Sequence, residues 1–149
     1  MEESSKTKTY EIYTDGSHNF NKIASWAFVV VVQPDNVSVH EASGIVEDVI
    51  AVRALWNVAG ELEAAMQGIK WAVETKTPVT LISDYEGIQG WAADWKTNNP
   101  WTMEYAKFAK KNKFYIGEFK HVKGHSKNKW NDYVDRLAGE LLKKETENE

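Results

Sequence analysis

The stretch that decides the fold is ASWAFVVVV at residues 24–32, followed by the turn sequence PDN at 34–36 and by VSVHEASGI at 37–45. Valine and aromatic residues favour a buried strand, and proline, aspartate and asparagine favour a tight turn. Upstream, residues 7–13 alternate apolar and polar side chains and lead to a predicted DGS turn at 15–17. These three segments predict an antiparallel meander of strands.

Downstream of residue 56 the apolar side chains change to a helical period, which predicts an amphipathic helix over 57–74. The remaining predicted elements are a strand at 79–83, helices at 86–96 and 101–111, a strand at 114–122 and a helix at 129–144. We therefore expect an α/β fold, with one five-stranded mixed sheet that begins with three antiparallel strands and carries helices on both faces. Residues 1–149 are expected to form one domain, with tails at 1–6 and 145–149.

The composition excludes several classes of site. The chain has no cysteine, so disulfides, zinc–thiolate sites and a cysteine nucleophile are excluded. No apolar run follows the charged N-terminus, and no segment approaches the roughly 20 apolar residues of a membrane span. We expect a monomeric, cytoplasmic protein with no membrane partner.

The charge is distributed unevenly along the chain. The formal net charge is −4, yet residues 96–129 contain nine lysines and two acids. A local basic block can bind nucleic acid on an acidic protein, because the local field governs binding more than the total charge. A solvated, lysine-rich helix face explains the same block equally well.

Seven tryptophans are present. Trp26, Trp56 and Trp71 lie in apolar surroundings and are predicted to fill the core. Trp91, Trp95 and Trp101 flank the basic block; packing in the core or at a hinge is the favoured role, and contact with a sugar–phosphate backbone is the alternative.

Four carboxylates stand at the ends of predicted elements: Asp15, Glu61, Asp84 and Asp135. Strand ends and the neighbouring helices of an α/β sheet meet at one edge, where these acids would repel one another. Divalent cations relieve such repulsion, and hard oxygen ligands favour Mg²⁺ or Mn²⁺. Two such ions about 4 Å apart are suited to phosphodiester hydrolysis.

Each acid also has an ordinary structural explanation. Asp15 suits a turn, Glu61 suits the N-terminus of a helix dipole, and Asp84 suits a helix cap. Asp135 suits an ion pair with a basic neighbour in the last helix. The joint placement on four different elements favours a metal site over four separate coincidences.

Four motifs carry a family resemblance: YTDGS at 13–17, NVAGELEAA at 57–65, ISDYEGI at 82–88, and VKGH at 122–125 followed by Asn131 and DRLA at 135–138. They resemble the successive motifs of type I ribonucleases H, in the order and at the separations of that family, over roughly residues 10–139. The stretch 84–96 particularly resembles the subgroup often joined to an N-terminal hybrid-binding domain, which this sequence does not include.

The resemblance implies an endoribonuclease that cuts the RNA strand of RNA–DNA hybrids with two Mg²⁺ ions, or Mn²⁺ as a substitute. Products would carry a 5′-phosphate and a 3′-hydroxyl. It implies that Asp15, Glu61, Asp84 and Asp135 are catalytic and bind the metals. It also implies that His125 helps product leave or shuttles a proton, which suits a group that titrates near neutrality.

The resemblance implies a second set of residues that bind the substrate: Gly16, Ser17, Asn57 and Asn131. The amide of Asn57 both donates and accepts, so it can hydrogen-bond a 2′-hydroxyl, or it can cap the helix that follows. Asn131 would orient the adjacent loop or touch the substrate. Alternatives for the whole protein are a non-catalytic hybrid-binding module, another nuclease of the same architecture, and a structural domain.

Overall fold

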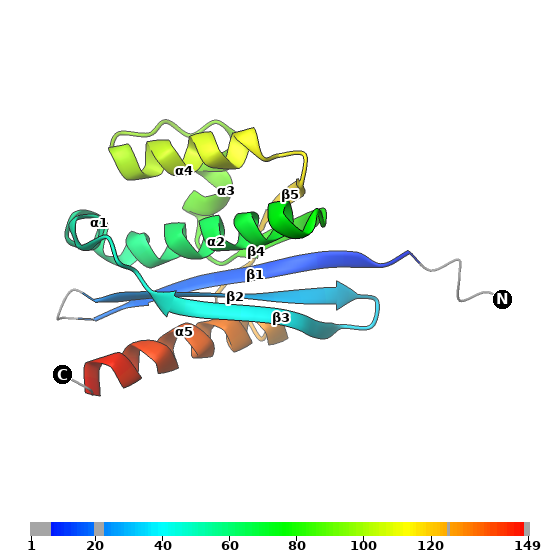
Figure 1. The fold of residues 1–149 in the computed structure, drawn as a ribbon, viewed down its shortest axis with the longest axis horizontal. Coiled ribbons are helices and arrows are strands. Elements are labelled where there is room, and N and C mark those ends of the chain that lie inside the picture. Colours follow the sequence, from blue (N-terminus) through cyan, green and yellow to red (C-terminus); the bar gives the residue numbers. More distant parts are fainter. Residues whose placement is uncertain (1–6, 20–22, 125, 148–149) are drawn as a thin grey trace.

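The computed structural model describes residues 7–19, 23–124 and 126–147. Its sheet has five strands in the order β3-β2-β1-β4-β5 (Figure 1). β1 pairs antiparallel with β2, and β2 with β3, whereas β4 runs parallel to β1 and β5 parallel to β4. The strands are β1 Thr9–His18, β2 Ala24–Gln33, β3 Val37–Ile45, β4 Val79–Ser83 and β5 Ile116–His121. The predicted fold class is confirmed.

Helices cover both faces of this sheet (Figure 1). α5 lies alone on one face, and the other helices lie on the opposite face. The helical elements are α1 Val49–Leu55, the 3₁₀ turn η2 Trp56–Val58, α2 Ala59–Thr75, α3 Glu86–Ala93, α4 Pro100–Lys111 and α5 Lys129–Glu147. None of the helices within the described ranges combines the length and the apolar character needed to cross a membrane.

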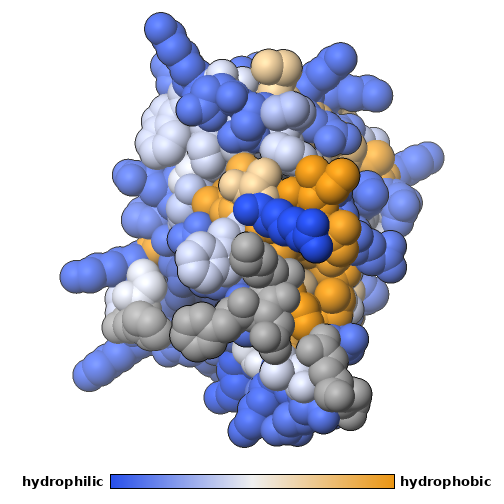
Figure 2. All heavy atoms as spheres, turned by 90° about the vertical axis from the view of Figure 1, so that its left-hand side faces the viewer, coloured by the Kyte–Doolittle hydropathy of each residue, from blue (hydrophilic) through white to orange (hydrophobic). Residues whose placement is uncertain are grey.

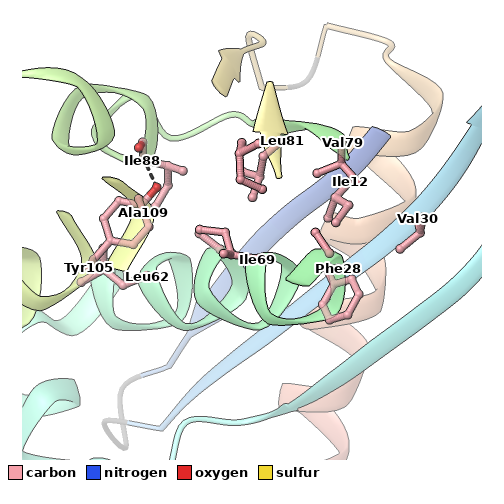
Figure 3. Packing of buried hydrophobic residues seen from close by; sticks show 13 residues of the cluster. Ile12, Phe28, Val30, Leu62, Ile69, Val79, Leu81, Ile88, Tyr105 and Ala109 are labelled. Atoms are coloured by element: carbon pink, nitrogen blue, oxygen red, sulfur yellow. Dashed lines mark hydrogen bonds between the residues drawn. The ribbon is translucent and has the colours of Figure 1, made fainter. Parts of the chain in front are cut away.

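The core lies in two layers, one on each side of the sheet. On the α2 side, Ile69 and Leu81 are fully buried (Figure 3). There the hydroxyl of the buried Tyr105 donates to the carbonyl oxygen of Ile88 at 2.8 Å, which ties α4 to α3. On the other side, α5 buries Val134 against β1 and β2. The sheet is therefore held from both faces, which fixes the positions of its strand ends.

Several elements differ from the prediction, among them β1, α1 and α5. β1 continues to His18 through the predicted turn at 15–17, because residues 15–18 find ladder partners in residues 24–27 of β2. α1 was not predicted; it is seven residues long, and its signal is the side chain of Asp48, which accepts from the Ala51 N–H at 3.0 Å. α5 runs to Glu147, into the segment predicted to be a tail.

The tryptophans divide differently from the prediction. Trp26 and Trp71 pack against the core, as do Trp91 and Trp101. Trp56, predicted as a core residue, is 47 % exposed, and Trp95 is 46 % exposed.

Figure 2 shows the end of the molecule that carries α1, where apolar surface gathers in one patch.

Candidate active site

Neighbouring strands bring the first two acids together. Thr14 of β1 pairs with Ser83 of β4 in parallel register, so Asp15 and Asp84 are the next residues on adjacent chains. Glu61 enters from the first turn of α2. One carboxylate oxygen from each of these three acids lies within 4.8 Å of the other two. Three of the four predicted acids therefore form one cluster.

Two glycines allow α2 to begin this close to the sheet. A Cβ on Gly16 would lie 2.3 Å from the carbonyl carbon of Gly60 and 2.5 Å from the backbone nitrogen of Glu61. A Cβ on Gly60 would lie 2.3 Å from the backbone oxygen of Ser25. These distances are too short for any side chain, so glycine at both positions is what sets Glu61 beside Asp15.

The acids of this cluster are crowded together, and burial with neighbouring carboxylates raises the pKa values of Asp15 and Glu61. Asp15 is 3 % exposed; its Oδ1 accepts from the Gly16 N–H at 2.9 Å. Its Oδ2 and the Oε1 of Glu61 are buried without a hydrogen-bond partner among the described residues. Burial raises the pKa of Asp15 to about 8, and the nearby carboxylates of Asp84 and Asp135 add to the rise. Burial, followed by the charges of Asp15 and Asp84, also raises the pKa of Glu61.

Asp135 stands at the border of this cluster. Its side chain is exposed on α5 and does not belong to the group of three acids within 4.8 Å. Its charge nevertheless contributes to the raised pKa values of Asp15 and Glu61. It therefore faces the cluster from the opposite side of the sheet to α2.

Asn131 forms a hydrogen bond with Asp84. Its side chain is 1 % exposed, and its Nδ2 donates to Oδ2 of Asp84 at 3.3 Å. Its backbone N–H donates to the Asn128 side chain at 3.0 Å, as at a capped helix N-terminus. A side chain so deeply buried offers a substrate almost no surface, which favours a positioning role over the direct contact predicted from the sequence.

Known proteins resemble this chain over most of its length. The RNase H family model matches residues 7–143. The chain belongs to the ribonuclease H family. The ribonuclease H of Caldanaerobacter subterraneus is 31 % identical over 90 % of this chain and 91 % of its own length. The ribonuclease H of Chlorobium limicola is 31 % identical over 91 % and 97 %. The resemblance drawn from the motifs is confirmed, and with it the assignment as an enzyme.

Solved structures support the same fold. The N-terminal RNase H domain of a Mycobacterium tuberculosis protein superposes with a TM-score of 0.74 at 17 % identity, covering 95 % of this chain and 99 % of that one. LC11-RNase H1, in complex with an RNA/DNA hybrid, gives a TM-score of 0.66 at 16 % identity, covering 90 % and 99 %. At these identities the likeness shows the fold alone.

The other predicted site residues of this ribonuclease H are distributed as follows. Gly16 and Ser17 lie partly exposed near the end of β1. Asn57 is exposed in η2; it does not cap α2, whose N-cap is Val58 with no side-chain hydrogen bond. The cap interpretation is therefore wrong, because the 3₁₀ turn separates Asn57 from the helix. His125 lies outside the described residues.

Two residues beside the acids were missed in the sequence. Burial and the charge of Glu61 raise the pKa of Tyr85, which places this ring next to the cluster. His121 Nε2 lies 3.3 Å from the backbone oxygen of Asp84. Tyr85 could have been identified in the sequence because it directly follows Asp84. His121 could have been identified because it ends a strand that runs parallel to β4.

Proposed function

We propose that this ribonuclease H is an endonuclease that hydrolyses the RNA strand of RNA–DNA hybrids, leaving 5′-phosphate and 3′-hydroxyl ends. The observation that carries the proposal is a pair of buried carboxylate oxygens, on Asp15 and Glu61, that have no hydrogen-bond partner in the described part of the chain, within a three-acid cluster that includes Asp84. The hybrid as substrate is supported by the fold neighbour LC11-RNase H1, which is described in complex with an RNA/DNA hybrid.

The donor set fits two Mg²⁺ ions, with Mn²⁺ as a substitute. All candidate ligands are carboxylate oxygens, the hard donors that Mg²⁺ prefers, and the chain has no thiols to favour softer metals. Asp15, Glu61, Asp84 and Asp135 would hold the ions. When bound, the pair would supply Lewis-acid activation of water and stabilisation of the leaving 3′ oxygen.

The chain's own residues orient this set. The Gly16 N–H holds one oxygen of Asp15, which leaves Oδ2 as the free donor. Asn131 holds Asp84 from α5 in the same way that hydrogen-bonded neighbours orient metal ligands elsewhere. Asp135, with its exposed side chain, would complete the set from the solvent side. His125, which precedes the first residue of α5 by four positions in the sequence, would assist product release or proton transfer.

Substrate recognition is proposed for the exposed polar groups beside the acids. Gly16 presents backbone near the end of β1, and the Ser17 hydroxyl and Asn57 amide can each pair with a 2′-hydroxyl. The lysines of residues 96–129 would contact the phosphates of the DNA strand. Binding through the 2′-hydroxyl and duplex shape requires little base recognition.

The test is an assay on sequence-matched RNA–DNA hybrid, double-stranded RNA and double-stranded DNA, each with Mg²⁺ and with a chelator. We expect cleavage of the RNA strand of the hybrid alone, abolished by the chelator and by Asp15→Asn. Asp35→Asn, at an exposed turn, is the matched control and should cleave normally. Wild-type rates in Asp15→Asn, or cleavage that persists in the chelator, would refute the proposal.

A further inference from the structure

Trp56 has an unfavourable backbone conformation for its residue type. Its φ is 50° and its ψ is −103°, at the point where α1 ends and η2 begins. Positive φ is a genuine outlier for a bulky side chain and normally favours glycine. Such strain persists where the surrounding structure imposes it, and it clusters at functional positions.

Exposure argues against a role for Trp56 in the core. The side chain is 47 % exposed, although a tryptophan that anchors a core is expected to be largely buried. A glycine would make the same chain reversal with less strain and without exposing an indole to water. Stability alone therefore does not explain a tryptophan here.

Neighbouring groups hold the indole in one place. The ring of His18, at the end of β1, meets it edge to face, with centroids 5.2 Å apart and planes at 71°. The indole Nε1–H donates to the backbone oxygen of Asn19 at 3.4 Å. The Trp56 backbone N–H donates to the carbonyl oxygen of Val52. The exposed ring is thus pre-organised, which lowers the entropy lost on binding.

The position relative to the acids defines what this ring can touch. His18 follows Asp15 by three residues on β1, which is about 10 Å along a strand. Successive nucleotides of one strand advance about 3.4 Å along the duplex axis. A nucleic-acid strand that ran along β1 with its cleaved phosphate at the acids would therefore reach Trp56 roughly three nucleotides away. Asn57, the next residue, is exposed at the same place.

We propose that Trp56, held by His18, is a substrate-contacting residue that packs against sugars lining the minor groove of the bound hybrid. The inference rests on the proposed function, since it takes the acids as the site of cleavage. An A-like duplex has a wide, shallow minor groove that a large flat side chain can enter from the surface. An indole contributes much apolar area at a small cost in side-chain entropy.

The experiment measures KM and kcat of the full chain for RNA–DNA hybrids shortened stepwise. Burial of roughly 60 Å² of indole corresponds to about a tenfold change in affinity. We expect Trp56→Gly to raise KM about tenfold on long hybrids, with kcat nearly unchanged. The difference from wild type should vanish once the hybrid is too short to reach residue 56. Trp56→Phe should recover most of the affinity.

Val37→Ala is the matched control, because Val37 is an apolar residue with a similar exposure of 48 %, and it lies at the start of β3, the opposite end of that strand from α1. It should leave KM unchanged at every length. The melting temperature of Trp56→Gly should stay within about 3 °C of wild type, since relief of strain opposes loss of the ring contact. A wild-type KM in Trp56→Gly, or a rise that is the same at all lengths, overturns the inference. If the wild-type protein cleaves no hybrid, the proposed function itself fails instead.

Discussion

Asp15→Asn should make the metal-free protein more stable while removing its activity. The substitution keeps an oxygen to accept from the Gly16 N–H and removes an ionisable group that lies beside the carboxylates of Asp84 and Asp135. It is nearly isosteric, so packing changes little. Stability and activity should therefore move in opposite directions, which a purely structural aspartate would not do.

The size of the gain follows from the protonation of Asp15. Its pKa rises from an ordinary 3.8 to about 8 in the folded protein. At about pH 7 the unfolded carboxyl lies roughly three pH units above its pKa, while the folded one is still mostly protonated. At about 1.4 kcal/mol per unit, holding this carboxyl protonated in the folded state costs about 4 kcal/mol of stability at pH 7. Because Glu61 shares proton binding with Asp15, we expect a gain of roughly 2–4 kcal/mol, or about 5–15 °C in melting temperature.

The pH dependence of stability gives an independent check that Asp15→Asn is stabilising. A carboxyl whose pKa is raised by folding makes the folded state bind protons more tightly than the unfolded state, so stability falls as the pH rises from about 4 towards 8. The advantage of Asp15→Asn should therefore be near zero at about pH 4 and grow through this window. Mg²⁺ should stabilise the wild-type protein more than the variant and narrow the difference.

The assay is urea unfolding followed by circular dichroism at several pH values, in chelator and then in Mg²⁺, with Asp35→Asn as the control for an exposed aspartate. The control should show no such gain. If Asp15→Asn is no more stable than wild type near neutral pH in chelator, or if its gain is the same at every pH, the raised pKa is not the cause and the electrostatic argument fails.

Three further outcomes are expected. Gly60→Ala should lose about 2–3 kcal/mol of stability and most activity, because its Cβ would meet backbone at 2.3 Å. The control Gly139→Ala, which has open space around the Cβ, should gain up to about 1 kcal/mol of stability, and thermal unfolding measures both changes. Asn131→Ala should raise the Mg²⁺ concentration for half-maximal activity about 10–100-fold with the fold retained, and an unchanged Mg²⁺ titration would remove its positioning role. Hybrid affinity should fall steeply with salt, and each lysine removed from residues 96–129 should reduce the slope by about one; a flat salt dependence would exclude this block as the phosphate-binding surface.

The sheet and its long helices could be predicted because their patterns are strong. The valine run of β2 and the helical period of α2 leave few alternatives, and their predicted positions agree with the structure to within a few residues. The prediction failed where local signals compete. A DGS sequence is typical of a turn, yet the pairing of β1 with the buried β2 keeps it extended. The helix α1 is short and rich in β-branched residues, so its sequence shows no clear helical period of apolar residues.

The positive φ of Trp56 could not be predicted from the sequence either, because it depends on contacts distant in sequence rather than on the residue type. The same limit applies to the site. Sequence spacing identified four acids, but it could not tell that three of them share one partly buried cluster while Asp135 stands exposed at the border. That distinction depends on how closely α2 and α5 approach β1, which is a property of packing.

Glycines next to the acids explain how this packing is achieved. Asp15 precedes Gly16, Glu61 follows Gly60, and a Cβ on Gly124 would lie 3.2 Å from the Oδ2 of Asp84. At Gly16 and Gly60 the backbones approach more closely than a Cβ would allow, so both glycines are needed for the acids to meet. Each approach buries the acids further and raises the pKa of Asp15 and Glu61. An acid next to a glycine on two converging elements therefore indicates a buried anionic site. Selection for fold stability alone would disfavour this pattern, because it brings like charges together.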